Sequence, residues 1–342
     1  MSKTKAITFA LLAAAFYAIN IPASKKLLDF VGPTMMAALL YLGAGIGIGV
    51  LSLLDRKKRN ERLDKKDLLF VMGMIVLDIA APIFLMLGLA YGTSSNASLL
   101  GNFEIVATAI IALAVFKEAV SGRLWFAIVL ITVSSILLSF EGTDSLRFSY
   151  GSLFVLAATL CWGFENNCTR KISSKSTYEI VILKGIFSGF GALVISFIKG
   201  ETIPQLIYVV LALLLGFVAY GLSIFLYVRA QNSLGAAKTS AYYAIAPFIG
   251  ALLSFLLLHE KLTRIYLIAF MVMIVGTAFV VMDTLAKNHI HIHTHTFTHI
   301  HDGSRHTHTI THSHAHDHYV TDKRHGHRHN RSELEKLIKT ER

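Results

Sequence analysis

The chain has 342 residues, of which 54% are hydrophobic and 15% are charged, and its mean hydropathy is +0.59. A soluble domain carries roughly 25% charged residues, so this composition excludes an ordinary water-soluble protein. The formal net charge of +11 does not indicate a nucleic-acid partner, because the basic residues collect in short segments between long apolar runs.

Ten apolar runs follow one another along the chain. Each is long enough for a helix that crosses the bilayer core, which takes roughly 20 residues. No amphipathic face separates one run from the next, as surface helices of a soluble protein would require. No small-residue cleavage pattern follows the first run, so we expect it to stay in the protein. The predicted transmembrane helices are 5–26, 33–54, 68–91, 96–117, 122–140, 150–169, 178–198, 204–228, 236–258 and 263–284.

Lysine and arginine are distributed unevenly among the connecting segments. If the N-terminus is cytoplasmic, the inner segments before residue 287 carry 16 of them, seven in the loop Asp55–Asp67, whereas the outer loops carry six. The positive-inside rule favours this orientation. We therefore expect an integral protein of the plasma membrane with both termini in the cytoplasm.

The two halves of the apolar region resemble each other. The segment Phe16–Lys26 aligns with Leu160–Lys171, and Phe116–Glu118 aligns with Leu258–Glu260, at offsets of 142 to 145 residues. Each half then holds five helices, and an odd number of helices per repeat places the two repeats in opposite orientation. The sequence therefore predicts an all-α, polytopic membrane protein with ten transmembrane helices in two inverted five-helix repeats, residues 1–145 and 146–285. Inverted repeats are typical of secondary transporters, whose substrate site lies between the repeats.

Particular residues carry a family resemblance over residues 5–284. They are Ser95–Leu100 with Phe103 and Glu104, Phe116–Glu118, Trp162 with Gly163, Ala246–Phe248, and His259–Thr263. On these residues the chain resembles EamA-type proteins of the drug/metabolite transporter superfamily. The resemblance implies a transporter, not an enzyme, that exports a small metabolite or an amphipathic solute.

The fourth run departs from the family pattern. The family often has a proline after the acidic residue of this helix, and here Ile105 follows Glu104. A break in the helix is therefore expected at Pro247 in the second half more than at the equivalent place in the first half.

Four charged residues stand well inside apolar runs: Asp78, Glu104, Glu165 and Lys184. A charge at the centre of a span costs about 2.5–3.5 kcal/mol on insertion scales, and it persists where it faces a cavity or a partner. Glu104 and Glu165 either line a solute cavity, with a role in proton coupling, or make buried structural contacts. Lys184 is expected to pair with Glu165 or Glu104. Asp78 is either a proton site or a partner for backbone groups freed by Pro82.

Uncharged polar and aromatic residues add candidates for the cavity lining. Each of them is equally compatible with packing or with anchoring at the membrane interface. These candidates are Asn20, Asn96, Asn166, Trp162, Tyr242 and Tyr243. The glycines at 43, 45, 47 and 49 indicate a close backbone approach, and they do not form a nucleotide-binding loop because no Lys-Ser/Thr follows them.

The last 57 residues, 286–342, form a histidine-rich tail that we expect to be cytoplasmic and disordered. Fifteen of the 16 histidines lie between residues 289 and 329. Neutral imidazole is a ligand for Zn, Ni, Co and Cu, so the tail is predicted to bind divalent metal, or else it chelates metal without a function. The candidate ligands are His289, His291, His293, His295, His312, His314, His316 and His318.

The best-supported function is a secondary transporter of a small-molecule substrate that works by alternating access in the lipid bilayer. No cofactor is required, and a homodimer is compatible with this plan. The alternative is a divalent-metal transporter or a metal-regulated membrane sensor that uses the tail. Against metal transport, His259 is the only histidine before the tail.

Overall fold

The computed structural model describes residues 2–54, 62–116, 121–141, 147–172, 175–234, 239, 242–261, 263–301 and 304–319. The chain divides into two compact units, Met1–Asp283 and Thr284–Arg342, and each is described by itself.

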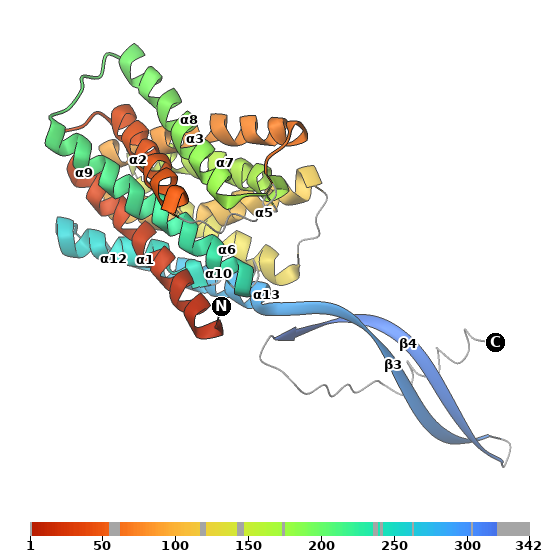
Figure 1. The fold of residues 1–342 in the computed structure, drawn as a ribbon. Helices are drawn as coiled ribbons and strands as arrows, with labels where there is room; N and C mark the ends of the chain where they lie inside the picture. The colour runs from red at the N-terminus through yellow and green to blue at the C-terminus, as the bar shows by residue number, and fades with distance from the viewer. Residues whose placement is uncertain are drawn as a thin grey trace. The chain divides into compact units, whose positions relative to one another are not determined.

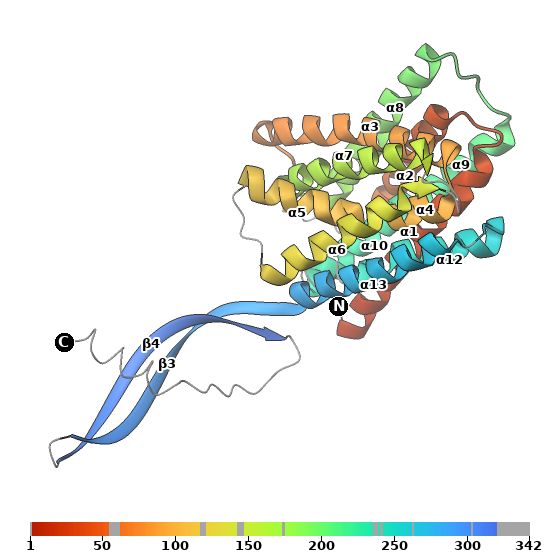
Figure 2. The ribbon, with the colours of Figure 1, turned by 180° about the vertical axis from the view of Figure 1, so that it is seen from behind.

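The first unit is a bundle of helices (Figures 1 and 2). Its first half contains α1 (Lys3–Leu27), α2 (Pro33–Leu54), η1 (Lys65–Asp67), α3 (Leu68–Tyr91), α4 (Ser94–Leu100), α5 (Phe103–Phe116) and α6 (Gly122–Leu138). Its second half contains α7 (Tyr150–Ile172), α8 (Thr177–Ile198), α9 (Leu206–Gly216), η2 (Phe217–Leu222), α10 (Ser223–Leu234), α12 (Ala246–Leu258) and α13 (Arg264–Leu285). Two-residue strands, β1 (Phe140–Glu141) and β2 (Arg147–Phe148), pair where the halves join.

The described helices account for all ten predicted spans. Seven helical segments are long and apolar enough to cross a membrane, and α6 and α12 are shorter apolar helices. The tenth is α7, whose C-terminal part carries the polar residues of the candidate site. Large apolar side chains remain exposed in the middle of several helices, with Val76 57%, Leu214 54% and Met271 60% exposed. Such a surface suits contact with lipid and not with water.

Three of the spans are interrupted. The fourth span breaks at Gly101 and Asn102, between α4 and α5, and the ninth breaks at residues 244–245, just before α12. The sequence favoured the second of these breaks over the first, and the structure has both. Because Gly101 and Asn102 lie close to the position equivalent to residues 244–245, the two halves share this feature without sharing a proline. The third interruption is η2, a π-helical turn within the span that runs from α9 to α10.

The contacts between the two halves are pseudo-symmetric. The second helix of each half packs against the other, as α2 against α8, and the fourth spans meet as α4 against α12. The remaining large contacts come in matched pairs. The third helix of the first half, α3, packs on the first helix of the second, α7, and correspondingly α1 packs on α10. Every main contact between the halves therefore has an equivalent with the halves exchanged.

Glycines allow α2 to approach its neighbours closely. A Cβ atom at Gly43 would come within 2.1 Å of a backbone oxygen of α9, and one at Gly45 within 2.7 Å of a backbone nitrogen of α8. A Cβ atom at Gly47 would meet the ring of a phenylalanine, whereas Gly49 has open space around it. The close approach predicted from these glycines is thus confirmed for three of the four positions.

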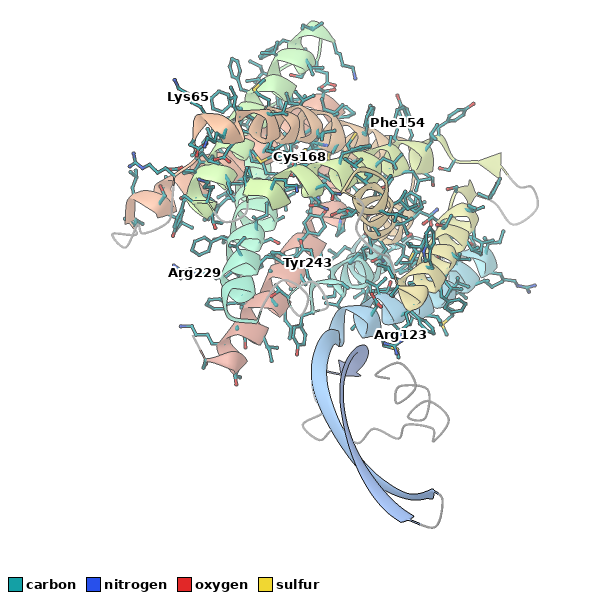
Figure 3. The ribbon with its side chains drawn as sticks, turned by 90° about the vertical axis from the view of Figure 1, so that its right-hand side faces the viewer. Lys65, Arg123, Phe154, Cys168, Arg229 and Tyr243 are labelled. Atoms are coloured by element: carbon teal, nitrogen blue, oxygen red, sulfur yellow. The ribbon has the colours of Figure 1, made fainter. Side chains whose placement is uncertain are left out.

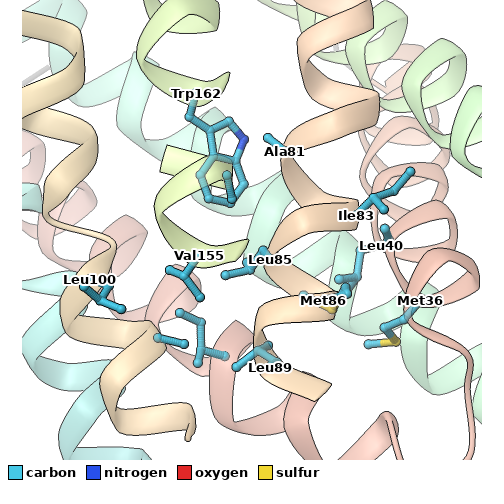
Figure 4. Close-up of a cluster of buried hydrophobic side chains, with 14 of the residues drawn as sticks. Met36, Leu40, Ala81, Ile83, Leu85, Met86, Leu89, Leu100, Val155 and Trp162 are labelled. Carbon is cyan, nitrogen blue, oxygen red and sulfur yellow. The ribbon is translucent and has the colours of Figure 1, made fainter. Parts of the chain in front are cut away.

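The apolar core lies between α2, α3 and α7. Met36, Leu40 and Met86 are fully buried there, and the indole of Trp162, 8% exposed, lies next to Ala81 (Figure 4). Dense packing at this place holds the three helices in a fixed relation. Two of these helices carry charged groups described below, with Asp78 on α3 and Glu165 on α7.

Acidic side chains of the second half cap helices of the first half. The carboxylate of Glu201 accepts hydrogen bonds from the backbone N–H groups of Thr34 (3.1 Å) and Met35 (2.7 Å) at the start of α2. The carboxylate of Glu260 accepts from Ser94 (2.7 Å) and Ser95 (2.8 Å) at the start of α4. Each carboxylate satisfies two otherwise unpaired N–H groups at the positive end of the helix dipole.

The second unit contains a two-stranded antiparallel ribbon, β3 (Ala286–His301) and β4 (Ser304–Tyr319). Isoleucine and threonine alternate with histidine in much of β3, and β-branched residues favour the extended backbone. Pairing with β4 gives the backbone groups of β3 hydrogen-bond partners that a single strand lacks.

Candidate functional site

Lys184 of α8 lies between two buried carboxylates. Its Nζ is 3.1 Å from Oδ2 of Asp78 on α3 and 2.9 Å from Oε1 of Glu165 on α7. The side chain of Asp78 is 0% exposed, that of Glu165 is 2% exposed and that of Lys184 is 14% exposed. The three groups form an ion-pair cluster within the membrane-spanning part of the bundle, with Asp78 from the first half and the other two from the second.

Aromatic side chains cover one side of this cluster. The hydroxyl of Tyr41 on α2 donates to Oδ1 of Asp78 at 3.0 Å, and the indole N–H of Trp162 donates to the Tyr41 hydroxyl at 3.4 Å. The ring of Tyr41 also lies 5.2 Å from that of Tyr220, on the π-helical turn η2. A π-helical turn is often found where a side chain has a functional role.

Tyr220 links the cluster to a second polar group on α1. The amide Nδ2 of Asn20 donates to the Tyr220 hydroxyl at 3.0 Å, and the hydroxyl of Ser24 donates to Oδ1 of Asn20 at 3.0 Å. Asn20 and Ser24 are fully buried. Their polar atoms are therefore satisfied by side chains of the bundle and do not need water.

Glu104 belongs to a neighbouring polar group. Its Oε1 accepts a hydrogen bond of 2.6 Å from Asn166 of α7, and the same amide lies 3.4 Å from the hydroxyl of Thr108 on α5. Glu104 and Asn166 are both half-buried, so this group is more open than the Asp78 cluster.

Tyrosine rings lie together beside α1. The ring of Tyr243, labelled in Figure 3, lies 6.0 Å from that of Tyr17 and 5.1 Å from that of Tyr227. Tyr17 in turn lies 5.8 Å from Tyr220, so the tyrosines continue to the ion-pair cluster. The arrangement offers flat apolar faces together with hydroxyl groups, which suits an amphipathic solute.

The centre of the bundle is built from equivalent positions of the two repeats. In the aligned segment Phe16–Lys26, Tyr17 is equivalent to Trp162 and Asn20 to Glu165. Offsets of 142 to 145 residues also set Tyr41 near the position of Lys184 and Asp78 near that of Tyr220. The two halves thus fill corresponding regions with different chemistry. The second half supplies the ammonium group and one carboxylate, whereas the first half supplies the other carboxylate.

The structure revises the partners expected for the charged residues. Lys184 pairs with Glu165, as expected, but its second partner is Asp78 and not Glu104. Asp78 is bonded to the side chains of Tyr41 and Lys184, so the carboxylate serves side chains and not the backbone groups freed by Pro82.

Two of the expected lining residues lie differently. Asn96 donates to the backbone oxygen of Leu138 at 3.2 Å, at the C-terminal end of α6, and so it is engaged away from the cluster. Tyr242 is half-buried just before α12, beside Tyr243 in the sequence. The structure brings Asp78, Glu165 and Lys184 into direct contact and links them to Trp162 through Tyr41. It brings Glu104 together with Asn166, and it links Asn20 and Tyr243 to the cluster through the tyrosines.

Sequence reasoning did not single out Tyr41 and Tyr220. Each tyrosine is an ordinary residue in an apolar run, and neither carries a charge that would mark it. The available signal was the offset between the halves, which sets Tyr41 near the position of Lys184 and Tyr220 near that of Asp78. A charged residue in one half of the chain can therefore direct attention to the corresponding region of the other half.

The cysteines Cys161 and Cys168 of α7 are both free thiols. Among the described residues of the first unit, no group of three or more His, Cys, Asp or Glu residues is placed to hold a metal ion. The charged groups of the site form an ion-pair cluster beside aromatic rings.

The fold and the buried charged cluster define a polytopic membrane protein of the transporter type. The model of the EamA-like transporter family matches residues 4–140 and again residues 149–282, and the chain therefore belongs to this family. The two matches coincide with the two five-helix halves.

Two further comparisons agree with the family. An uncharacterized transporter of Methanothermobacter thermautotrophicus is 26% identical over 284 residues, which cover 77% of this chain and 82% of that protein. A crystal structure of another protein matches with a TM-score of 0.63 at 14% identity, covering 83% of this chain and 98% of that one. This second likeness shows the fold alone.

Proposed function

We propose that this protein is a secondary transporter that exports a small metabolite or an amphipathic solute across the plasma membrane by alternating access. The observation that carries the proposal is the buried ion-pair cluster of Asp78, Glu165 and Lys184 with its aromatic neighbours. Charges within a span cost about 2.5–3.5 kcal/mol each on insertion scales, and they are expected where a solute or ion path runs. Residues of both repeats meet at this cluster, as in sites that open to alternate sides.

The two repeats have opposite orientations in this proposal, and contacts at the helix ends support it. Glu201, after the second helix of the second half, caps α2, which follows the first loop of the first half. Lys175, in the first loop of the second half, lies 3.6 Å from Asp64 and 3.8 Å from Asp67, in the second loop of the first half. At each end of the bundle, the first loop of one half thus meets the second loop of the other half. In parallel repeats the first and second loops would lie at opposite ends of the bundle and could not meet.

Proton coupling follows from the charges of the cluster. Lys184 carries one positive charge, whereas Asp78 and Glu165 carry two negative charges when both are ionised. A surplus charge without a partner is costly inside a protein, so a proton or a cationic group of the solute is expected to balance it. If the two exchange at the same carboxylates, solute leaves the cell as a proton enters.

The test uses the full-length protein in proteoliposomes that contain a pH-sensitive dye. Organic cations, zwitterions and neutral amphipathic metabolites are offered with and without a proton gradient. We expect at least one cationic or amphipathic solute to move with an opposing proton flux. Glu165→Gln removes the surplus negative charge and leaves Asp78 to pair with Lys184, so the opposing proton flux should disappear.

The matched control is Asn96→Ala, because Asn96 is bonded to the end of α6. This variant should keep the exchange of solute for protons. Proton exchange that is undiminished in Glu165→Gln would contradict the coupling mechanism. Absence of transport for the whole panel in the wild-type protein would contradict an organic solute as the cargo.

A further inference from the structure

The register of the ribbon sets histidines of β3 opposite histidines of β4. Four directly opposed pairs occur: His289 with His316, His291 with His314, His293 with His312, and His299 with His306. Nothing in a disordered histidine-rich chain requires such matching. A slip of the register by a single residue would set each of these histidines opposite a residue other than histidine.

The register also gathers the histidines on one face of the ribbon. Alternate residues of a strand belong to the same face, and directly opposed residues share it. In β3 the histidines occupy odd-numbered positions only, and their partners in β4 have even numbers. All twelve histidines of the ribbon therefore fall on one face: His289, His291, His293, His295, His299, His301, His306, His308, His312, His314, His316 and His318. The other face holds mainly threonine and isoleucine in β3, with no histidine at any paired position of the described strands.

Two apolar positions divide this histidine face into two blocks. Phe297 stands opposite His308, and Ile310 stands opposite His295. The block formed by residues 289–295 and 312–318 contains eight histidines, and the block formed by residues 299–301 and 306–308 contains four. The number of histidines in each block, eight or four, is divisible by four, which is the number of ligands that a tetrahedral metal ion takes.

The spacing of these positions suits a tetrahedral metal ion. Opposed residues have Cα atoms about 4.5–5.5 Å apart, and residues two apart along a strand are separated by about 6.5–7 Å. Two neighbouring opposed pairs therefore set four histidine positions close together on one face of the ribbon. Zinc is held by four ligands in this geometry, with Zn–N distances of about 2.0–2.1 Å, and nickel, cobalt and copper also accept imidazole nitrogen.

We propose that the histidine face of the β3–β4 ribbon binds divalent transition-metal ions such as zinc in a row. Ligands come from both strands, so each ion joins β3 to β4. With four imidazoles to an ion, the face holds about three ions, two on the eight-histidine block and one on the four-histidine block. This site does not depend on the transport function proposed above.

The first experiment measures zinc bound to the purified full-length protein by equilibrium dialysis and elemental analysis. The variant His291→Ala with His314→Ala removes one opposed pair. Its matched control is His325→Ala with His327→Ala, which removes two histidines that lie outside the described residues. We expect the first variant to lose about one of three ions and the control to keep all of them. Equal loss in the two variants would overturn the proposal, because a chain without register loses the same capacity wherever two histidines are removed.

The second experiment tests the register directly in a background with Cys161→Ala and Cys168→Ala. Thr294 and Thr311 are directly opposed on the other face of the ribbon. With oxidised glutathione as the oxidant, the pair Thr294→Cys and Thr311→Cys should form a disulfide by thiol–disulfide exchange, and zinc should speed its formation. The control pair Thr294→Cys and Thr307→Cys is displaced by four residues along β4 and should cross-link much more slowly. Equal cross-linking of both pairs in the presence of zinc would overturn the proposal.

Discussion

At the scale of single residues, the central feature is one ammonium group shared by two carboxylates. Lys184 is the cation in contact with Asp78 and Glu165, and both acids are nearly inaccessible. A buried ion pair is held at a cost of desolvation, and removing one partner leaves an unpaired charge that destabilises the protein more than the pair stabilised it. The cluster is therefore most sensitive to the loss of Lys184, the partner that both acids share.

Lys184→Met should destabilise the protein strongly, because it leaves Asp78 and Glu165 without their cation. Loss of one partner of a buried pair typically costs about 3–5 kcal/mol. Thermal unfolding of the purified protein in detergent measures the change. Adding Asp78→Asn and Glu165→Gln to Lys184→Met removes the unpaired charges and should recover part of the loss. A triple variant less stable than Lys184→Met would show that the three groups do not act as one cluster.

Glu104→Gln distinguishes a cavity role from a structural one. The amide oxygen of glutamine can still accept the hydrogen bond from Asn166, so stability should be nearly unchanged while transport is lost. Uptake into proteoliposomes and unfolding temperature are measured on the same preparation. If Glu104 is structural, the variant should instead lose about 1–3 kcal/mol of stability through unsatisfied partners. A variant that is fully active and fully stable would remove Glu104 from the site.

At the scale of elements, the interruptions and caps of the helices position the site. The helix α4 has seven residues, too few to be stable alone, and its first turn depends on the carboxylate of Glu260 from the other half. The break at Gly101 and Asn102 follows at once, and Glu104 lies in the first turn of α5. The breaks therefore place Glu104 at a helix start in the middle of the bundle, opposite Asn166.

The glycines of α2 differ in how much space surrounds them, because α2 packs closely on its neighbours at some of these positions only. A Cβ atom at Gly45 would meet backbone atoms of α8 at 2.7 and 2.9 Å, whereas Gly49 has nothing within 4 Å. Gly45→Ala should destabilise the protein by about 1–3 kcal/mol, as overpacking does. Gly49→Ala should be neutral or stabilise the helix by up to about 1 kcal/mol. Equal effects on the unfolding temperature would contradict the close approach of α2 and α8.

At the scale of the whole molecule, orientation in the membrane is the property that remains a prediction. Reporter fusions after Leu54 and at Arg342 should both give cytoplasmic signals, because the inner segments carry most of the basic residues. A fusion in the loop after Ile198 serves as the control and should give an external signal. An external signal at either of the first two positions would contradict the proposed inverted repeats.

The sequence by itself determined the class of the protein and most of its architecture. Eight of the ten apolar runs predicted helix bounds within about three residues of the observed ones, because the bilayer core demands about 20 apolar residues whatever the neighbouring helices are. The exceptions are the eighth span, which ends at Leu234 and not at 228, and α12, which begins at Ala246 and not at 236. The offset between the halves also predicted the two repeats that the family matches later confirmed. These signals are local or periodic along the chain, so they can be read without the fold.

Only the tertiary structure decided which polar groups meet. Asp78 joins Lys184 across 106 positions of sequence, and Tyr41 and Tyr220 enter the site through contacts between helices that leave no periodic signal. The break between α4 and α5 was equally hidden, because it depends on a capped short helix and not on a proline. In the tail, composition predicted affinity for metal, but the strand register alone assigned twelve histidines to one face. Contacts between distant segments depend on packing geometry, which composition and spacing do not specify.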